Sequence, residues 1–147
     1  MQPAPTGYHD LTQAVTQQLR ELRGGTPDAM KAFNELSRAA IAPGVLDSKT
    51  KELVALALSV AARCDPCIGF HTKALVKYGA TRQELLETLA VCTYMGGGPS
   101  MMYAASAVAA FDEASKPAGW AARSASQPTA ATSAACSSQQ RRSSASL

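Results

Sequence analysis

The sequence has few aromatic residues and no long hydrophobic run. Phe, Trp and Tyr together make up 5% of its 147 residues. This scarcity argues against a β-sandwich, whose strands favour β-branched and aromatic residues. The longest strongly apolar stretch, residues 53–62, contains Ser59 and is too short to cross a bilayer. We therefore expect no transmembrane segment and no membrane partner.

The first residues of the sequence give no reason to expect a secretory signal. The first ten residues, MQPAPTGYHD, contain no basic segment followed by an apolar one. Four cysteines in a chain without such a signal favour catalytic or metal-binding thiols over a disulfide framework, because the cytosol is reducing. The sequence therefore predicts a cytoplasmic protein.

Acidic residues are absent from the C-terminal part of the chain. All eleven Asp and Glu lie within residues 1–114, where ten Lys and Arg nearly balance them. The net charge of +3 thus belongs to residues 115–147 and gives no reason to expect nucleic-acid binding by the folded part. Residues 115–147 are mostly Ala, Ser, Thr, Gln and Pro, which bury too little apolar surface to offset their ordering entropy. We predict a folded domain over residues 1–114 and a disordered tail over 115–147.

Helix signals dominate the remainder. No stretch of four or more residues shows convincing strand alternation. Helix-starting and helix-ending residues recur instead, with Thr26 as a predicted N-cap of the second helix. The pattern predicts an all-α, compact domain of about six helices, near residues 8–23, 26–41, 48–62, 65–79, 81–98 and 99–111.

Three further helix starts carry capping signals. Asp47 or Ser48 is expected to cap the third helix, and Asp65, which is followed by proline, the fourth. Thr81 with Glu84 three residues later predicts a capping box at the start of the fifth. These signals place the chemistry-bearing residues described below at the start of a helix.

The third predicted helix is apolar almost around its whole circumference between residues 53 and 62. Such a helix is buried on most sides, either in the centre of a bundle or at a subunit interface. A folded part of roughly 110 residues buries only about two-thirds of its own surface. We therefore expect an obligate homo-oligomer.

The segment RCDPCIGFH carries the strongest sign of chemistry. Two thiols separated by two residues, Cys64 and Cys67, can form a disulfide with little backbone change. In the first turn of a helix capped by Asp65, Cys67 would be favoured as thiolate by the exposed N–H groups and the helix dipole. His71 follows four residues later on the same face, where an imidazole can take and return the thiol proton. Cys64 can then attack oxidised Cys67 as the resolving thiol.

Other interpretations of these residues remain open. Cys64, Cys67, His71 and a carboxylate could together bind zinc, although structural zinc usually stabilises folds that lack a core. Buried cysteines can also serve packing alone, which is the expectation for Cys92. Glu52 precedes the apolar part of its helix and is equally consistent with a surface acid near a helix N-terminus. His9, in a polar helix, is expected to be exposed.

Residues 46–113, and more weakly those back to 30, resemble the AhpD-like alkylhydroperoxidase branch of the carboxymuconolactone decarboxylase family. The resemblance rests on Glu52, on the CxxCxxxH pattern that ends at His71, and on the sequence GGGP before the last predicted helix. It implies an all-helical fold that assembles as trimers or hexamers. It also implies peroxide reduction, with the enzyme recharged by a dithiol reductant that is a small molecule or a redox protein. No cofactor and no metal are expected.

The resemblance also implies a role for each site residue. Cys67 is similar to the peroxidatic cysteine, Cys64 to the resolving one, His71 to the helix histidine and Glu52 to the acid that starts a proton relay. The sequence departs from the family pattern at Pro66, where the better-known members have a second histidine. Glu52 is therefore expected to act on Cys67 or His71 directly or through water.

Two alternative functions are considered. A lactone decarboxylase of the same family would use His71 or Glu52 as a base and would not need the cysteines. A non-catalytic helical oligomer could instead sense oxidation, with the disulfide changing its assembly rather than turning over peroxide.

Overall fold

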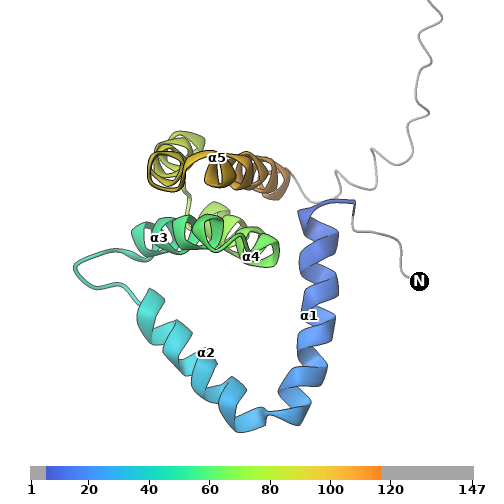
Figure 1. Ribbon diagram of the computed structural model, residues 1–147. Coiled ribbons are helices and arrows are strands. Elements are labelled where there is room, and N and C mark those ends of the chain that lie inside the picture. The colour runs from blue at the N-terminus through green and yellow to red at the C-terminus, as the bar shows by residue number, and fades with distance from the viewer. Residues whose placement is uncertain (1–5, 117–147) are drawn as a thin grey trace, which may run out of the picture. The chain divides into compact units, whose positions relative to one another are not determined.

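The computed structural model describes residues 6–116, and these residues are helical with no strand among them. Five helices follow one another along the chain (Figure 1): α1 (Tyr8–Gly25), α2 (Pro27–Ile41), α3 (Ser48–Ala61), α4 (Asp65–Lys77) and α5 (Arg82–Ala114). The predicted all-α class is confirmed. The predicted disordered tail, from residue 117 on, lies outside the described residues.

Helix α5 accounts for the two last predicted helices. Its backbone leaves helical geometry at Gly97, where φ is 63° and ψ is −154°. A positive φ costs glycine little because it has no Cβ. Pro99 follows two residues later and lacks the N–H that a continuous helix would bond. The chain therefore kinks where the sequence predicted one helix to end and another to begin.

The core lies between α3, α4 and α5, each of which packs against the other two. Buried side chains spaced three, four or seven residues apart on each helix point into it, which is the pattern that buries one face of a helix. The buried apolar residues include Leu56, Val60, Ile68, Leu75, Leu85, Leu89, Ala107, Ala110 and Phe111.

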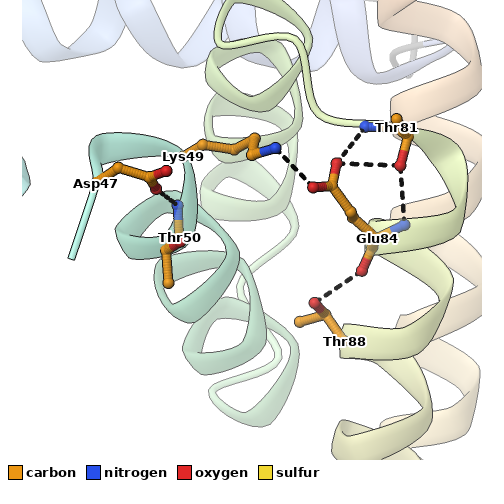
Figure 2. A network of polar contacts seen from close by, with 6 residues as sticks. All are labelled: Asp47, Lys49, Thr50, Thr81, Glu84 and Thr88. Carbon is orange, nitrogen blue, oxygen red and sulfur yellow. Dashed lines mark hydrogen bonds and ion pairs between the residues drawn. The ribbon is translucent and has the colours of Figure 1, made fainter.

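The N-termini of α3 and α5 are joined by a polar network (Figure 2). Asp47 caps α3 by accepting the N–H of Thr50 at 2.7 Å, and Thr81 with Glu84 forms the predicted capping box of α5. Lys49 reaches across from α3 to Glu84, with Nζ and Oε1 2.6 Å apart. Hydrogen bonds from Lys49 and Thr81 hold the pKa of Glu84 at about 2. Both predicted caps are confirmed.

Helix α1 docks on the start of α4, where Gly69 faces it. A Cβ added to Gly69 would come within 2.6 Å of the Thr12 methyl group and 3.1 Å of the Tyr8 ring. Lys73 of α4 donates a hydrogen bond to the hydroxyl of Thr12. At the N-terminus of α1, the Glu113 carboxylate accepts the backbone N–H of Tyr8 at 2.9 Å. The start of α1 is thereby held against both α4 and α5.

Helix α2 has no buried residue, and within residues 6–116 it contacts only α1 and α3. Figure 1 shows it leading from the far end of α1 back to the start of α3. Phe33 and Leu36 on it are exposed. The predicted capping by Thr26 is wrong: this residue occupies the N-cap position, but its hydroxyl donates to the carbonyl of Leu22 at 2.8 Å in the preceding helix.

Helix α3 is buried on one side within a single chain. Glu52, Leu56 and Val60 face the interior, whereas Val54 and Leu58 are exposed. Within residues 6–116, this apolar helix is therefore not covered on most of its sides.

Candidate active site: a dithiol beside a buried Glu52–His71 pair

The junction between α3 and α4 positions Cys64. The N–H of Cys64 bonds the carbonyl of Ser59 at 3.0 Å, and that of Arg63 bonds the carbonyl of Val60 at 3.1 Å. This pair of bonds is the Schellman motif that ends many helices. Arg63 occupies its left-handed position with φ of 56°, the only non-glycine residue with a positive φ among residues 6–116. The end of α3 thus determines where the first cysteine lies.

Cys64 and Cys67 are joined by a disulfide, with their Cα atoms 5.2 Å apart. The sequence assigned the N-cap of α4 to Asp65, and this is wrong. Cys64 is the N-cap, since its sulfur accepts the backbone N–H of Cys67 at 3.3 Å, and Asp65 is the first helical residue. The capping atom is thus one of the two disulfide sulfurs, and Cys64 both follows the end of α3 and caps α4.

Glu52 and His71 form a hydrogen-bonded pair across α3 and α4. The Glu52 Oε2 and His71 Nδ1 atoms are 2.7 Å apart. The Glu52 side chain is 8% exposed and that of His71 32%, so the acid is buried behind a more accessible imidazole. Because Glu52 is buried, its interpretation as a surface acid no longer holds.

This geometry fits direct action of Glu52 on the histidine. Pro66 replaces the second histidine of the family pattern, and the bond from Glu52 reaches His71 without an intermediate residue. A carboxylate on Nδ1 orients the ring and directs Nε2 toward proton exchange. No residue within 6–116 bonds Nε2. His71 lies one helical turn after Cys67, so the two side chains share a face of α4.

Sequence reasoning missed Tyr8, which reaches the site from α1. Its hydroxyl donates to Asp65 Oδ1 at 3.0 Å, and Asp65 lies between the two cysteines in the chain. Burial raises the pKa of Tyr8 to about 12, so the phenol keeps its proton and acts as a donor. A pocket of about 470 Å³ lies beside this bond, lined by Thr6, Gly7, Tyr8, Leu11, Asp65 and Pro66. No local signal identifies Tyr8, because the contact spans 57 positions of sequence.

The remaining candidates lie apart from this site. Cys92 is buried in the core as predicted, and burial raises the pKa of its thiol. His9 is exposed as predicted, with its ring next to the Gln13 amide. In the part of the chain that the structure describes, no three His, Cys, Asp or Glu side chains are grouped so that they could hold a metal ion. No helix of that part is long and apolar enough to span a membrane.

Residues 27–110 match the model of the carboxymuconolactone decarboxylase family. This match covers more than half of the chain, and the chain belongs to that family. It is also 44% identical over 98 residues to an uncharacterised protein of Cupriavidus necator, covering 67% of this chain and 87% of that protein. An uncharacterised protein of the cox locus of Paracoccus denitrificans is 37% identical over 82 residues, covering 56% of this chain and 74% of the relative.

Two solved structures resemble this fold. A carboxymuconolactone decarboxylase family protein of Legionella pneumophila, solved in its apo form, is 54% identical with a TM-score of 0.73. That alignment covers 74% of this chain and 97% of the Legionella chain. A family member of Thermotoga maritima, described as possibly involved in antioxidative response, is 33% identical with a TM-score of 0.63. That alignment covers 69% of this chain and 87% of the Thermotoga chain.

Proposed function

We propose that this protein is a thiol-dependent peroxide reductase that cycles the Cys64–Cys67 disulfide and is recharged by a dithiol partner. The observation that carries the proposal is the placement of the dithiol at the start of α4, one turn before a histidine bonded to a buried acid. A nucleophilic thiol near an oriented proton carrier is the arrangement that covalent thiol catalysis requires.

The proposed cycle has three balanced steps. The Cys67 thiolate attacks the outer oxygen of a hydroperoxide; the O–O bond breaks, and His71 supplies the proton that leaves with the alcohol. Cys67 is then a sulfenic acid. The Cys64 thiol displaces its hydroxyl group, which forms the disulfide and releases water. An external dithiol reduces this disulfide by two successive exchanges and is itself oxidised to a disulfide.

Glu52 acts in this proposal through His71. Its carboxylate holds Nδ1, so the ring is oriented before a peroxide arrives and its other nitrogen is available for the proton transfer. Support from the relatives is general: the Thermotoga maritima protein, 33% identical, is described as possibly antioxidative.

The test is peroxide consumption by the full chain with dithiothreitol as the dithiol, in wild type and single variants. Cys67→Ser should lose turnover entirely. Cys64→Ser, treated with peroxide in the absence of dithiothreitol, should form sulfenic acid once and then stop, because the resolving thiol of the protein is gone. Glu52→Gln and His71→Gln should each lower the rate by about 10²-fold, the lower end of general acid–base contributions. Full activity in Cys67→Ser would refute the proposal.

Matched controls are available on the same chain. His9→Gln changes an exposed histidine, and Glu87→Gln changes an exposed glutamate; neither residue contacts the dithiol site. Both variants should keep wild-type turnover. Loss of activity in Glu52→Gln but not in Glu87→Gln would assign the effect to the buried acid rather than to charge in general.

The same variants, with lactone decarboxylation measured beside peroxide consumption, separate the two alternative functions. A lactone decarboxylase would keep its activity in Cys67→Ser and lose it in His71→Gln. A redox sensor would consume about one equivalent of peroxide per chain and no more, even with excess dithiothreitol. Sustained turnover that depends on both cysteines is the result expected here.

The proposal includes assembly of several copies of the chain as a trimer or hexamer. Among residues 6–116, apolar side chains are exposed on several elements, among them Val54 and Leu58 on α3 and Phe33 and Leu36 on α2. Exposed apolar surface of this extent is usually covered by a partner. Light scattering at micromolar concentration should give the mass of three or six chains, and the mass of one chain would refute this part.

A further inference from the structure

Within residues 6–116, Tyr8 is the one residue of α1 whose side chain is hydrogen-bonded to the dithiol segment, residues 64–67. Its hydroxyl donates to Asp65 Oδ1 at 3.0 Å, and its ring lies against Gly69, one turn further along α4. The proposed peroxide reduction uses neither Tyr8 nor Asp65. A contact between an N-terminal helix and the residue between two redox-active cysteines therefore needs its own explanation.

The carboxylate of Asp65 occupies a position that matters for the thiols. It lies in the first turn of α4, where the N–H groups and the helix dipole stabilise negative charge. A Cys67 thiolate would be stabilised by the same N–H groups and the same helix dipole at the start of α4. Two negative charges at one helix start repel each other, so an uncompensated Asp65 disfavours the thiolate.

We propose that Tyr8 is a positioning residue that sets the reactivity of the dithiol through Asp65. The hydrogen bond from Tyr8 withdraws negative charge from the Asp65 carboxylate and holds this carboxylate toward α1. The thiolate is then easier to form than it would be beside a free carboxylate. This inference rests on the proposed function only in taking Cys64 and Cys67 as the reactive pair.

The surroundings of Tyr8 fit the role of donor. Partial burial raises its pKa to about 12, a side-chain hydrogen bond with Ser106 opposes the rise, and Asp65 adds to it. Tyr103 of α5 also raises the pKa of Tyr8, and the Glu113 carboxylate accepts a hydrogen bond from the Tyr8 backbone N–H. The phenol is therefore protonated at every pH at which thiols titrate, and its effect does not change across a thiol titration.

Among the described residues, the other charged groups near the dithiol make no hydrogen bond that removal of the Tyr8 hydroxyl would break. Arg63 precedes Cys64 in sequence, and Glu52 with His71 forms the pair on the other side of α4. None of these three is hydrogen-bonded to Asp65 within residues 6–116. Their contributions to the thiol pKa are common to the variants below and cancel when those variants are compared.

The experiment measures the pH dependence of thiol alkylation in the reduced full-length protein. Iodoacetamide labelling is followed by mass spectrometry of the tryptic peptide from Cys64 to Lys73, which contains both thiols and excludes Cys92. This readout needs no peroxide turnover, so its failure is distinguishable from failure of the proposed function. Thermal unfolding of each variant reports on the fold.

Tyr8→Phe keeps the ring and removes the donor. The alkylation profile should move to higher pH by about half a unit, so the rate at neutral pH falls about threefold while the high-pH plateau is unchanged. Asp65→Asn should move the profile the other way, because the repelling charge is gone. Tyr78→Phe, which removes an exposed hydroxyl from the far end of α4, should leave the profile unchanged.

The double variant decides the mechanism. If Tyr8 acts through the charge of Asp65, adding Tyr8→Phe to Asp65→Asn should shift the profile no further. An unchanged profile in Tyr8→Phe alone would overturn the inference. A shift of equal size in the Asp65→Asn background would overturn it too, since Tyr8 would then act by another route. A lowered plateau with no pH shift would show a purely structural role and refute it as well.

Discussion

Replacing Gly69 by alanine tests the docking of α1 on α4. Alanine in place of glycine inside a helix normally stabilises by about 1 kcal/mol, because glycine loses more backbone entropy on folding. At Gly69 the structure predicts the opposite. The added Cβ would lie 2.6 Å from the Thr12 methyl group. Ordinary carbon–carbon contact is about 3.5–4.0 Å, so one group must move by about 1 Å.

Thr12 cannot move freely to make that space. It is 1% exposed, its hydroxyl lies 2.8 Å from the Tyr8 carbonyl oxygen, and it also accepts a hydrogen bond from Lys73. Rotating its side chain loses hydrogen bonds of about 1 kcal/mol each. Moving α1 instead costs the 1–3 kcal/mol typical of overpacked sites. After the gain in helix propensity, Gly69→Ala should be about 1 kcal/mol less stable than wild type.

The assay is thermal unfolding at one fixed protein concentration, since assembly makes the melting temperature depend on concentration. Gly69→Ala should melt about 4–8 °C lower. The control is Gly24→Ala near the end of α1, where an added Cβ meets nothing within 4 Å. That variant should be more stable by about 0.5 kcal/mol.

A compensating change identifies the clashing atom. Thr12→Ser removes the methyl group that the new Cβ would strike and keeps the hydroxyl. In combination with Gly69→Ala it should recover most of the lost stability, so the two substitutions are not additive. If Gly69→Ala melts at or above the wild-type temperature, the close approach of α1 and α4 is not what limits this position.

Three further predictions concern stability. Arg63→Gly should raise the free energy of unfolding, measured by urea denaturation, by about 0.5–1 kcal/mol. A left-handed residue other than glycine costs about 1–2 kcal/mol, and the larger backbone entropy that glycine loses on folding offsets part of this gain. The equivalent position after α4 already holds Gly79, with φ of 70°. The folded-state pKa of Glu84 lies at about 2, against a usual value of 4.5, so its contribution to stability is complete above pH 4.5 and declines as pH falls toward 2. The substitution Lys49→Met should make this decline shallower when the melting temperature is measured across acid pH. An identical slope in wild type and variant would contradict the ion pair. Deleting residues 117–147, whose composition offers little apolar surface, should change the melting temperature by less than about 4 °C and leave the oligomer mass at an equal number of chains.

The helix boundaries were largely predictable because their signals are local. Asp47, Thr81 and Glu84 cap helices through atoms within three residues of each other, and the structure has these caps as predicted. The failures at Thr26 and Asp65 have different causes. Thr26 occupies the N-cap position but its hydroxyl donates to the carbonyl of Leu22, whereas Asp65 lies inside α4 because Cys64 takes the N-cap position.

The site was predictable to the extent that its residues share one segment. The spacing of Cys64, Cys67 and His71 along a single helix brings them together whatever the rest of the chain does. Glu52 could be assigned only through the family resemblance, since a lone acid early in a helix carries no sign of its partner. Its bond to His71 depends on how α3 and α4 pack.

By itself, the sequence determined the all-α class, the helix starts marked by local capping pairs, and the dithiol with its histidine, because each depends on residues within about one helical turn. Only the tertiary structure decided that Glu52 is buried against His71, that Cys64 rather than Asp65 caps α4, and that Tyr8 reaches Asp65 in the dithiol segment. The bonds of Glu52 and Tyr8 depend on how helices pack, and the Cys64 cap depends on where α3 ends relative to α4. Packing is the sum of many weak contacts over the whole core, and no short stretch of residues encodes it.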